Sequence, residues 1–131
     1  ELPVTTLDAA LAERACGPVS FIKCDVEGHE FDVFRGGEQV LRRDHPVLLF
    51  ECLREEEDCG ELFEWLVALG YDGFFFHVTP EDHASYVRNG RGRYVHYTER
   101  ADFDYVRPSI EGRNYLFLPC GRRPWSEDTG R

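Results

Sequence analysis

The chain has 131 residues, 42 % of them hydrophobic, which is the composition of one globular domain and excludes a disordered tail. Its formal net charge is −10, and an acidic surface repels phosphates, so the composition argues against an extended nucleic-acid footprint. No apolar run approaches the ~20 residues that a membrane-spanning helix needs. We therefore expect neither nucleic acid nor a membrane as a partner.

The first predicted element is a helix capped by Thr5 or Thr6. Val19 to Cys24 follows as an almost continuous apolar run, which is typical of a strand covered on both faces. The next helix is predicted from about Phe31 to Arg43. It contains Gly36-Gly37, although each glycine inside a helix costs about 1 kcal/mol relative to alanine. A close approach of the backbone to the sheet or to a ligand would explain this pair.

Three more strands are predicted further along the chain. Val47 to Cys52 is the second strand and Tyr71 to Val78 the third, with a helix between them that Gly70 ends. Asn114 to Leu118 is the last strand. Strands that alternate with helices favour parallel pairing with right-handed crossovers, so we predict a doubly wound α/β arrangement or a portion of one.

The predicted domain extends over residues 1–120 and the polar tail over 121–131. Within the domain, residues 79–113 are predicted as an unassigned insertion or cap. One helix start is predicted there, at Thr79-Pro80, because proline is favoured at the first helical position.

The cysteines are odd in number and form no Cys-x-x-Cys pair; they are Cys16, Cys24, Cys52, Cys59 and Cys120. Cys24 and Cys52 fall inside apolar runs, where a free thiol behaves as a small buried hydrophobe. We interpret all five as reduced thiols of a cytoplasmic protein, in preference to a zinc site or a disulfide framework.

The densest group of ionisable residues comes directly after the first predicted strand, in Asp25-Val26-Glu27-Gly28-His29-Glu30. Glu51 lies in the same way at the end of the second strand. Ligands of open α/β sheets bind beyond the carboxyl ends of the parallel strands. Asp25, Glu27 and His29 are therefore the candidate catalytic residues.

Each residue of this group also has a structural interpretation. Asp25 can cap the helix that starts near Glu30, and Glu27 and Glu30 can stabilise that helix through its macrodipole. His29 is balanced between a base and a solvated turn residue, and Gly28 serves backbone geometry. Lys23 can pair with a carboxylate.

Four blocks of the sequence carry a resemblance in their order and spacing: Thr6-Leu7-Asp8, Phe21 to Glu30, Val33 to Gly37 and Pro46 to Glu51. They resemble the FkbM family of S-adenosylmethionine-dependent methyltransferases, most specifically in the Ile-Lys-x-Asp-Val-Glu-Gly core. Cys24 departs from the family, which has an aliphatic residue there. Asn114 to Phe117 is similar to the family's closing strand.

The resemblance implies a Rossmann-like sheet of which this chain carries the second half, with mostly parallel strands and an antiparallel last strand. It implies S-adenosylmethionine as the cofactor and a hydroxylated small molecule, a sugar or natural product, as the acceptor. The family's glycine-rich cofactor loop does not occur in this sequence, so the cofactor-binding residues stay unassigned. We expect the isolated chain to be an inactive fragment, and the absence of methionine agrees with a processed product or a piece of a larger protein.

Methyl transfer to a hydroxyl needs an aligned oxygen and a base that takes its proton. Asp25 and Glu51 together can hold a hard cation such as Mg²⁺, which would lower the pKa of the hydroxyl. Glu27 or His29 would then act as the base. Residues that can line the acceptor pocket are His83, Tyr86, Tyr94, His96, Tyr97 and Tyr105.

Two alternatives stay open. The first is a non-catalytic α/β module, because Val19 to Cys24 would form an exposed sheet edge that invites self-association or a partner chain. The second is a phosphotransferase of the strand-Asp-x-Asp type, with Asp25 at its strand end. Glu27 in the second acidic position and the lack of a later Lys or Asp motif weaken it.

Overall fold

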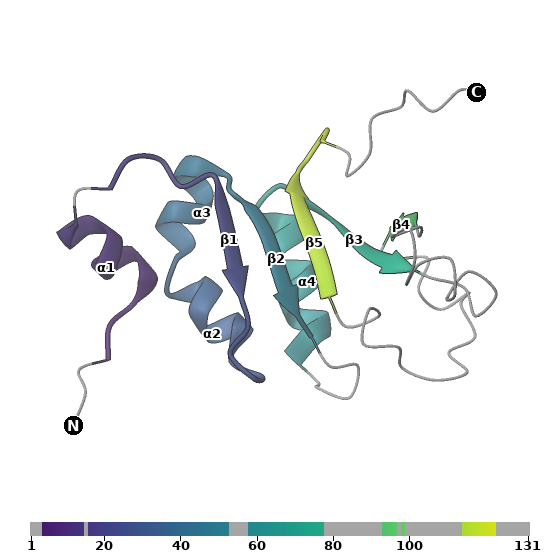
Figure 1. Cartoon of the computed structure of the whole chain (residues 1–131), viewed down its shortest axis with the longest axis horizontal. Helices are drawn as coiled ribbons and strands as arrows, with labels where there is room; N and C mark the ends of the chain where they lie inside the picture. The colour runs from purple at the N-terminus through teal and green to yellow at the C-terminus, as the bar shows by residue number, and fades with distance from the viewer. Residues whose placement is uncertain are drawn as a thin grey trace, which may run out of the picture.

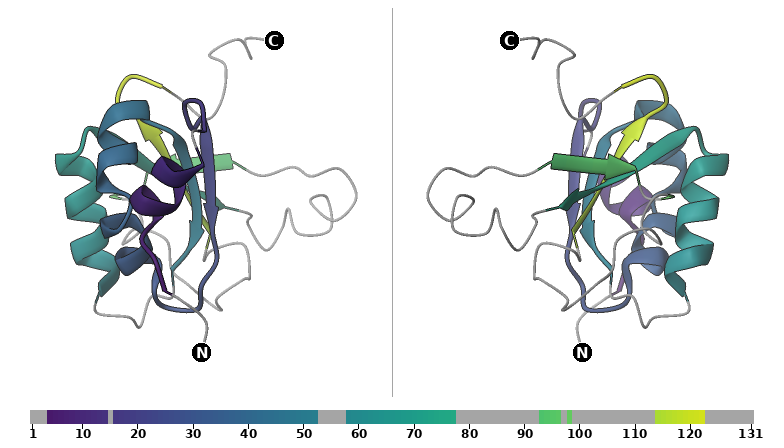
Figure 2. Two further views of the ribbon diagram at one scale, coloured as in Figure 1. Left: turned by 90° about the vertical axis from the view of Figure 1, so that its left-hand side faces the viewer. Right: turned by 90° about the vertical axis from the view of Figure 1, so that its right-hand side faces the viewer.

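The computed structural model describes residues 4–14, 16–52, 58–77, 93–96, 98 and 114–122. Its elements are α1 (Leu7–Glu13), β1 (Phe21–Cys24), α2 (Glu30–Arg35), α3 (Glu38–Asp44), β2 (Val47–Glu51), α4 (Asp58–Ala68), β3 (Tyr71–His77), β4 (Arg93–His96) and β5 (Asn114–Pro119). The strands form one open sheet (Figure 1). All the described helices lie on one side of it (Figure 2), so the described part has one helical layer rather than two.

The sheet order is β1-β2-β5-β3-β4. β1 pairs with β2 in parallel, whereas β5 lies antiparallel between β2 and β3, and β4 is antiparallel to β3. The parallel pairing that the alternation of strands and helices predicts is found between β1 and β2. The antiparallel last strand that the resemblance implies is confirmed, because β5 is antiparallel to both of its neighbours. This strand enters the middle of the sheet, between two strands that precede it in the chain, and the antiparallel β4 was not predicted.

The long helix predicted after β1 is two helices, α2 and α3, which are separated at Gly36-Gly37. A Cβ atom on Gly37 would lie 2.7 Å from Cδ2 of Leu7, at the start of α1. The amide of Asp8 donates to the carbonyl of Gly36 over 2.9 Å. The pair does have a close neighbour, but that neighbour is the start of α1 and not the sheet that was expected.

Asp8 also caps α3 from outside that helix. Its carboxylate oxygens accept hydrogen bonds from the amides of Gln39 (3.0 Å) and Val40 (2.9 Å), which are orphan donors of the first turn. Thr6 caps α1 itself by accepting from the amide of Ala9 at 3.2 Å, which confirms one of the two predicted caps. The segment Thr6–Asp8 therefore caps two helices at once.

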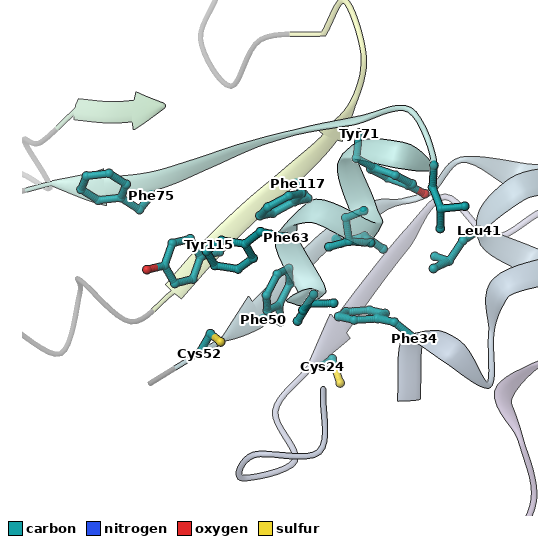
Figure 3. Packing of buried hydrophobic residues seen from close by; sticks show 14 of the residues in the cluster. Cys24, Phe34, Leu41, Phe50, Cys52, Phe63, Tyr71, Phe75, Tyr115 and Phe117 are labelled. Atoms are coloured by element: carbon teal, nitrogen blue, oxygen red, sulfur yellow. The ribbon is translucent and has the colours of Figure 1, made fainter. Parts of the chain in front are cut away.

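The core lies between the sheet and helices α2, α3 and α4, and its centre is aromatic (Figure 3). The rings of Phe63 and Tyr115 are 4.7 Å apart, and those of Phe34 and Phe50 are 5.2 Å apart. Side chains alternate between the two faces of a strand. Because Cys24, Phe50 and Tyr115 are buried on the helical side, the residues next to them at the strand ends belong to the opposite face.

Residues 79–113, which were predicted as an unassigned insertion or cap, lie mostly outside the described residues. The described part of this stretch includes β4, which extends the sheet beyond β3. The predicted helix start at Thr79-Pro80 lies outside the described residues, as does the tail beyond residue 122. In the described part of the chain, no helix has the length and apolar character needed to cross a membrane.

The expectation of five reduced cysteines is wrong, because Cys52 and Cys59 form a disulfide. The first turn of α4 folds back against the end of β2 and brings the two Cα atoms to 6.3 Å, within the range that a disulfide can bridge. Spacing along the chain does not reveal this contact. Cys16, Cys24 and Cys120 are free thiols, of which Cys24 is buried.

Candidate functional site

Polar residues of three neighbouring strands meet where β1 and β2 end, at what we call the carboxyl edge. Cys24 of β1 pairs with Phe50 of β2, and Asp25 and Glu51 are the next residues of the two chains. They therefore lie at the same end of adjacent parallel strands, whose spacing in a sheet is about 4.8 Å. Glu51 pairs in turn with Asn114 of β5. Asn114 was not predicted as a site residue, because the sequence does not show that β5 lies beside β2.

The carboxylate of Asp25 pairs with the ammonium group of Lys23, with Nζ and Oδ2 3.1 Å apart. Both side chains are about half exposed, so the pair contributes little stability. The pairing expected for Lys23 is confirmed. The interpretation of Asp25 as a helix cap is wrong, since the cap of α2 is His29 and no side chain caps that helix.

The turn between β1 and α2 has an unusual backbone. Glu27 has φ of 56° and Gly28 has φ of 95°, so the role of Gly28 in backbone geometry is confirmed. The carboxylate of Glu30 accepts hydrogen bonds from the amides of Val26 at 3.0 Å and Gly28 at 3.1 Å. Glu30 is buried, with 4 % of its surface exposed, which a side chain acting on the helix macrodipole alone does not require.

The two candidate bases of this turn are both exposed. Nδ1 of His29 lies 3.5 Å from Oδ2 of Asp32, a long contact within the first turn of α2. If Nδ1 carries the proton in this contact, Nε2 is the nitrogen that can accept a proton, and the side chain of His29 is 75 % exposed. Glu27 is the residue with left-handed backbone at the tip of the turn, and its side chain is exposed.

Cys24 lies beside these groups, but it is not a nucleophile. Burial raises the pKa of its thiol to about 11, with further contributions from the charges of Glu30 and Asp25. The thiolate is the reactive form of cysteine. Cys24 is therefore a neutral core residue at neutral pH.

The donor set of the carboxyl edge is limited. Within the described ranges there is no group of three or more His, Cys, Asp or Glu residues that could hold a metal ion. Asp25 and Glu51 are thus a pair of carboxylates, with the side chain of Asn114 beyond Glu51.

A second polar cluster ties β3 to β4 at the other end of the sheet. Nε2 of His96 lies 2.6 Å from Oδ1 of Asp72, and its Nδ1 lies 2.5 Å from Oγ1 of Thr98. His96 also packs edge-on against Phe74. His96 was predicted to line an acceptor pocket, and the structure places it in this contact between strands.

Of the other predicted pocket residues, Tyr94 lies in β4. The remaining four lie outside the described residues; they are His83, Tyr86, Tyr97 and Tyr105.

Comparison with known proteins identifies a family. Residues 1–72 match the family model of the methyltransferase FkbM domain, which covers more than half of the 131 residues. The matched segment contains β1, the turn with Asp25 and Glu30, and β2 with Glu51. No curated protein and no solved structure matches the chain.

Proposed function

The chain belongs to the FkbM methyltransferase family, and on this premise we propose that it serves the transfer of a methyl group from S-adenosylmethionine to a hydroxyl group of a sugar or natural product. The observation that carries the proposal is the parallel register of β1 and β2, which puts Asp25 and Glu51 at the same edge. Ligands of open α/β sheets bind beyond this edge.

The sheet order supports the proposed fold. An antiparallel last strand between β2 and β3 is the arrangement expected if this chain is the second half of a Rossmann-like methyltransferase sheet. β1 and β2 would then be the fourth and fifth strands of the whole sheet, with β3 the sixth and β5 the seventh. β4 would be an addition at the outer edge.

The described residues do not complete a site for S-adenosylmethionine. In the turn after β1, the amides of Val26 and Gly28 already bind the carboxylate of Glu30. They are not available to a ribose or a carboxylate of the cofactor. We propose that the described residues do not bind the adenosine of the cofactor.

We propose that the residues of the carboxyl edge orient the acceptor substrate. Asp25 and Glu51 accept hydrogen bonds from hydroxyl groups, and a substrate with several hydroxyls can engage both carboxylates and the amide of Asn114. Proton removal belongs to His29 or Glu27, the exposed groups of the turn. Alignment of the hydroxyl and removal of its proton are the two tasks that the protein performs in this reaction.

Mg²⁺ dependence remains a prediction of this proposal. Two carboxylates and an amide oxygen are the hard ligands that Mg²⁺ prefers, and it commonly binds through one or two carboxylates. Asp25 and Glu51 would hold the ion, which would lower the pKa of the acceptor hydroxyl. Chelation of divalent metal should then abolish methyl transfer and added Mg²⁺ should restore it; full activity in the chelator contradicts this part.

The test uses the natural gene product that contains this chain, with radiolabelled S-adenosylmethionine and a panel of sugars and hydroxylated natural products. Glu27→Gln and His29→Asn are compared with Glu38→Gln, which changes an exposed carboxylate of α3 paired with Arg42. We expect one of the first two variants to lower kcat about 100-fold and the control to keep its activity. Transfer unaffected by both variants would overturn the assignment of the base.

The isolated chain offers a second test. Titration calorimetry of S-adenosylmethionine into the 131-residue chain should show weak binding or none, because the glycine-rich loop that the resemblance assigns to the cofactor does not occur in this sequence. Saturable binding in the micromolar range would mean that these residues form a cofactor site by themselves.

One observation favours a second candidate function, a module that pairs with another chain. Among the described strands, β1 stands at the end of the sheet with β2 as its neighbour. Phe21 on this strand exposes 51 % of its surface. An edge strand with exposed apolar side chains is a template for a further strand, so we propose this edge as the place of self-association or of a partner chain.

A further inference from the structure

We propose that Glu30 is a positioning residue for methyl transfer: its buried carboxylate fixes the turn that presents Asp25 and Glu27. The effect on catalysis rests on the proposed function, whereas the effect on the turn does not. Glu30 was interpreted from the sequence as a partner of the helix macrodipole, and the structure gives it a more specific task.

The contacts of Glu30 enclose the tip of the turn. One carboxylate oxygen accepts from the amide of Val26 and the other from the amide of Gly28, the residues immediately before and after Glu27. Glu27 has φ of 56°, a region that residues with side chains rarely adopt. The carboxylate thus binds the backbone on both sides of the strained residue and stabilises its conformation.

The burial of Glu30 separates this role from a general electrostatic one. A buried carboxylate is costly unless it is hydrogen-bonded, and bonds to backbone amides are of the stronger, charge-assisted kind. Asp32 shares the first turn of α2, but its side chain is 79 % exposed, which is sufficient for an interaction with the macrodipole. Glu30 is instead 4 % exposed and folds back beneath the turn.

The consequence for the site follows from the position of Asp25 in the chain. On one side it is joined to Cys24, which is paired with β2 and buried in the core. On the other side it is joined to Val26, whose amide Glu30 holds. Loss of Glu30 therefore frees one side of Asp25 and both sides of Glu27, while the charges of these two candidate residues stay unchanged.

Amide hydrogen exchange measured by NMR on the full chain tests the structural part. Glu30→Gln keeps the shape of the side chain but replaces one acceptor oxygen by a donor, Glu30→Ala removes both acceptors, and Asp32→Asn is the matched control. We expect exchange at least about tenfold faster at Val26 or Gly28 in Glu30→Gln and at both in Glu30→Ala. Asp32→Asn should leave both rates within about twofold.

Unchanged exchange at both amides in Glu30→Gln would overturn the proposal, and this variant carries the test if Glu30→Ala does not fold. Exchange that rises equally at the turn and in the core strand residue Leu48 would also overturn it, because Glu30 would then act on overall stability.

Kinetics of the natural gene product test the catalytic part. Glu30→Gln should lower kcat about 10- to 100-fold, since displacement of a catalytic group by about 1 Å has an effect of this size. The pKa values of the pH–rate profile should stay in place, because Glu30 does not exchange the proton. A kcat equal to that of the wild type, or a displaced pH profile, contradicts a positioning role. Absence of methyl transfer in the wild type would instead overturn the proposed function and leave the exchange result standing.

Discussion

At the scale of single residues, Asp44 is the carboxylate whose pKa the structure perturbs most clearly. Its oxygens accept hydrogen bonds from the guanidinium of Arg43, at 2.7 Å each, and from the amide of Val19 at 2.9 Å. The bonds to Arg43, and next the bond to Val19, lower the pKa of Asp44 to about 2. Asp44 thereby joins the end of α3 to the segment that leads into β1.

The pH dependence of stability follows from this shift. An unfolded aspartate has a pKa of about 3.9, so the folded state binds the proton less tightly than the unfolded state. The contribution of Asp44 is therefore complete above about pH 4 and is lost as the pH falls towards 2. We expect Asp44→Asn to lower the urea midpoint at pH 7. The variant should also lose less stability than the wild type when the pH falls from 4 to 2. An equal loss of stability in both proteins would show that other groups cause the acid destabilisation.

The residue scale also shows how far the sequence informs the site. Asp25 and Glu51 were predicted because each directly follows or ends an apolar run, and such runs are local signals. The task of Glu30 was not predictable, since it depends on a left-handed residue, Glu27, whose φ leaves no mark in the sequence. Asn114 was missed because only the pairing of β5 with β2 brings it to the carboxyl edge.

At the scale of elements, the contact of α1 with α3 depends on Asp8. Its carboxylate supplies the acceptors for two amides of the first turn of α3, and loss of such a cap typically costs about 1 kcal/mol. Asp8→Ala should lower the free energy of unfolding by about this amount in urea titrations. Asp32→Ala, which removes an exposed first-turn carboxylate of α2, should change it by less than about 0.5 kcal/mol. If both variants lowered the free energy of unfolding equally, the stabilisation would come from the negative charge near the helix start and not from the capping hydrogen bonds.

Two glycines test the packing of α4 and β3 in opposite directions. A Cβ atom on Gly73 would collide with the ring of Phe117 in the core, whereas nothing lies within 4 Å of the corresponding position at Gly60 in α4. Gly73→Ala should destabilise the fold by about 1–3 kcal/mol through overpacking. Gly60→Ala should stabilise it by up to about 1 kcal/mol through helix propensity. Thermal unfolding of both variants checks the pair, and a neutral Gly73→Ala would contradict the packing.

At the scale of the whole molecule, the sequence predicts the α/β class and the order of most elements. Apolar runs bounded by residues such as Pro46 and Gly70 mark the strands and helices within a few residues. Two features depend on tertiary structure. They are the insertion of β5 into the middle of the sheet and the disulfide between Cys52 and Cys59. Local pattern carries no information on such contacts, which is why the place of β5 in the sheet and the disulfide were not predicted from the residues alone.

The exposed edge at β1 makes a prediction at this scale. Phe21→Lys places a charge on the edge strand, and Val67→Lys places the same charge on α4, where Val67 is 42 % exposed. If β1 is an association surface, the mean mass from light scattering should rise with concentration for the wild type and for Val67→Lys. The mean mass of Phe21→Lys should stay closer to that of a monomer. A wild-type chain that stays monomeric at high concentration contradicts the second candidate function.

The central claim is that Asp25 and Glu51 act together to orient one acceptor substrate, and a double-mutant cycle tests it most directly. The natural gene product and its variants Asp25→Asn, Glu51→Gln and the double variant are compared by kcat/KM for methyl transfer. Groups that act as a unit are not additive, so we predict a loss of about 100-fold for each single variant and little further loss for the double variant. Losses that multiply independently, or single variants that retain full activity, would contradict the account.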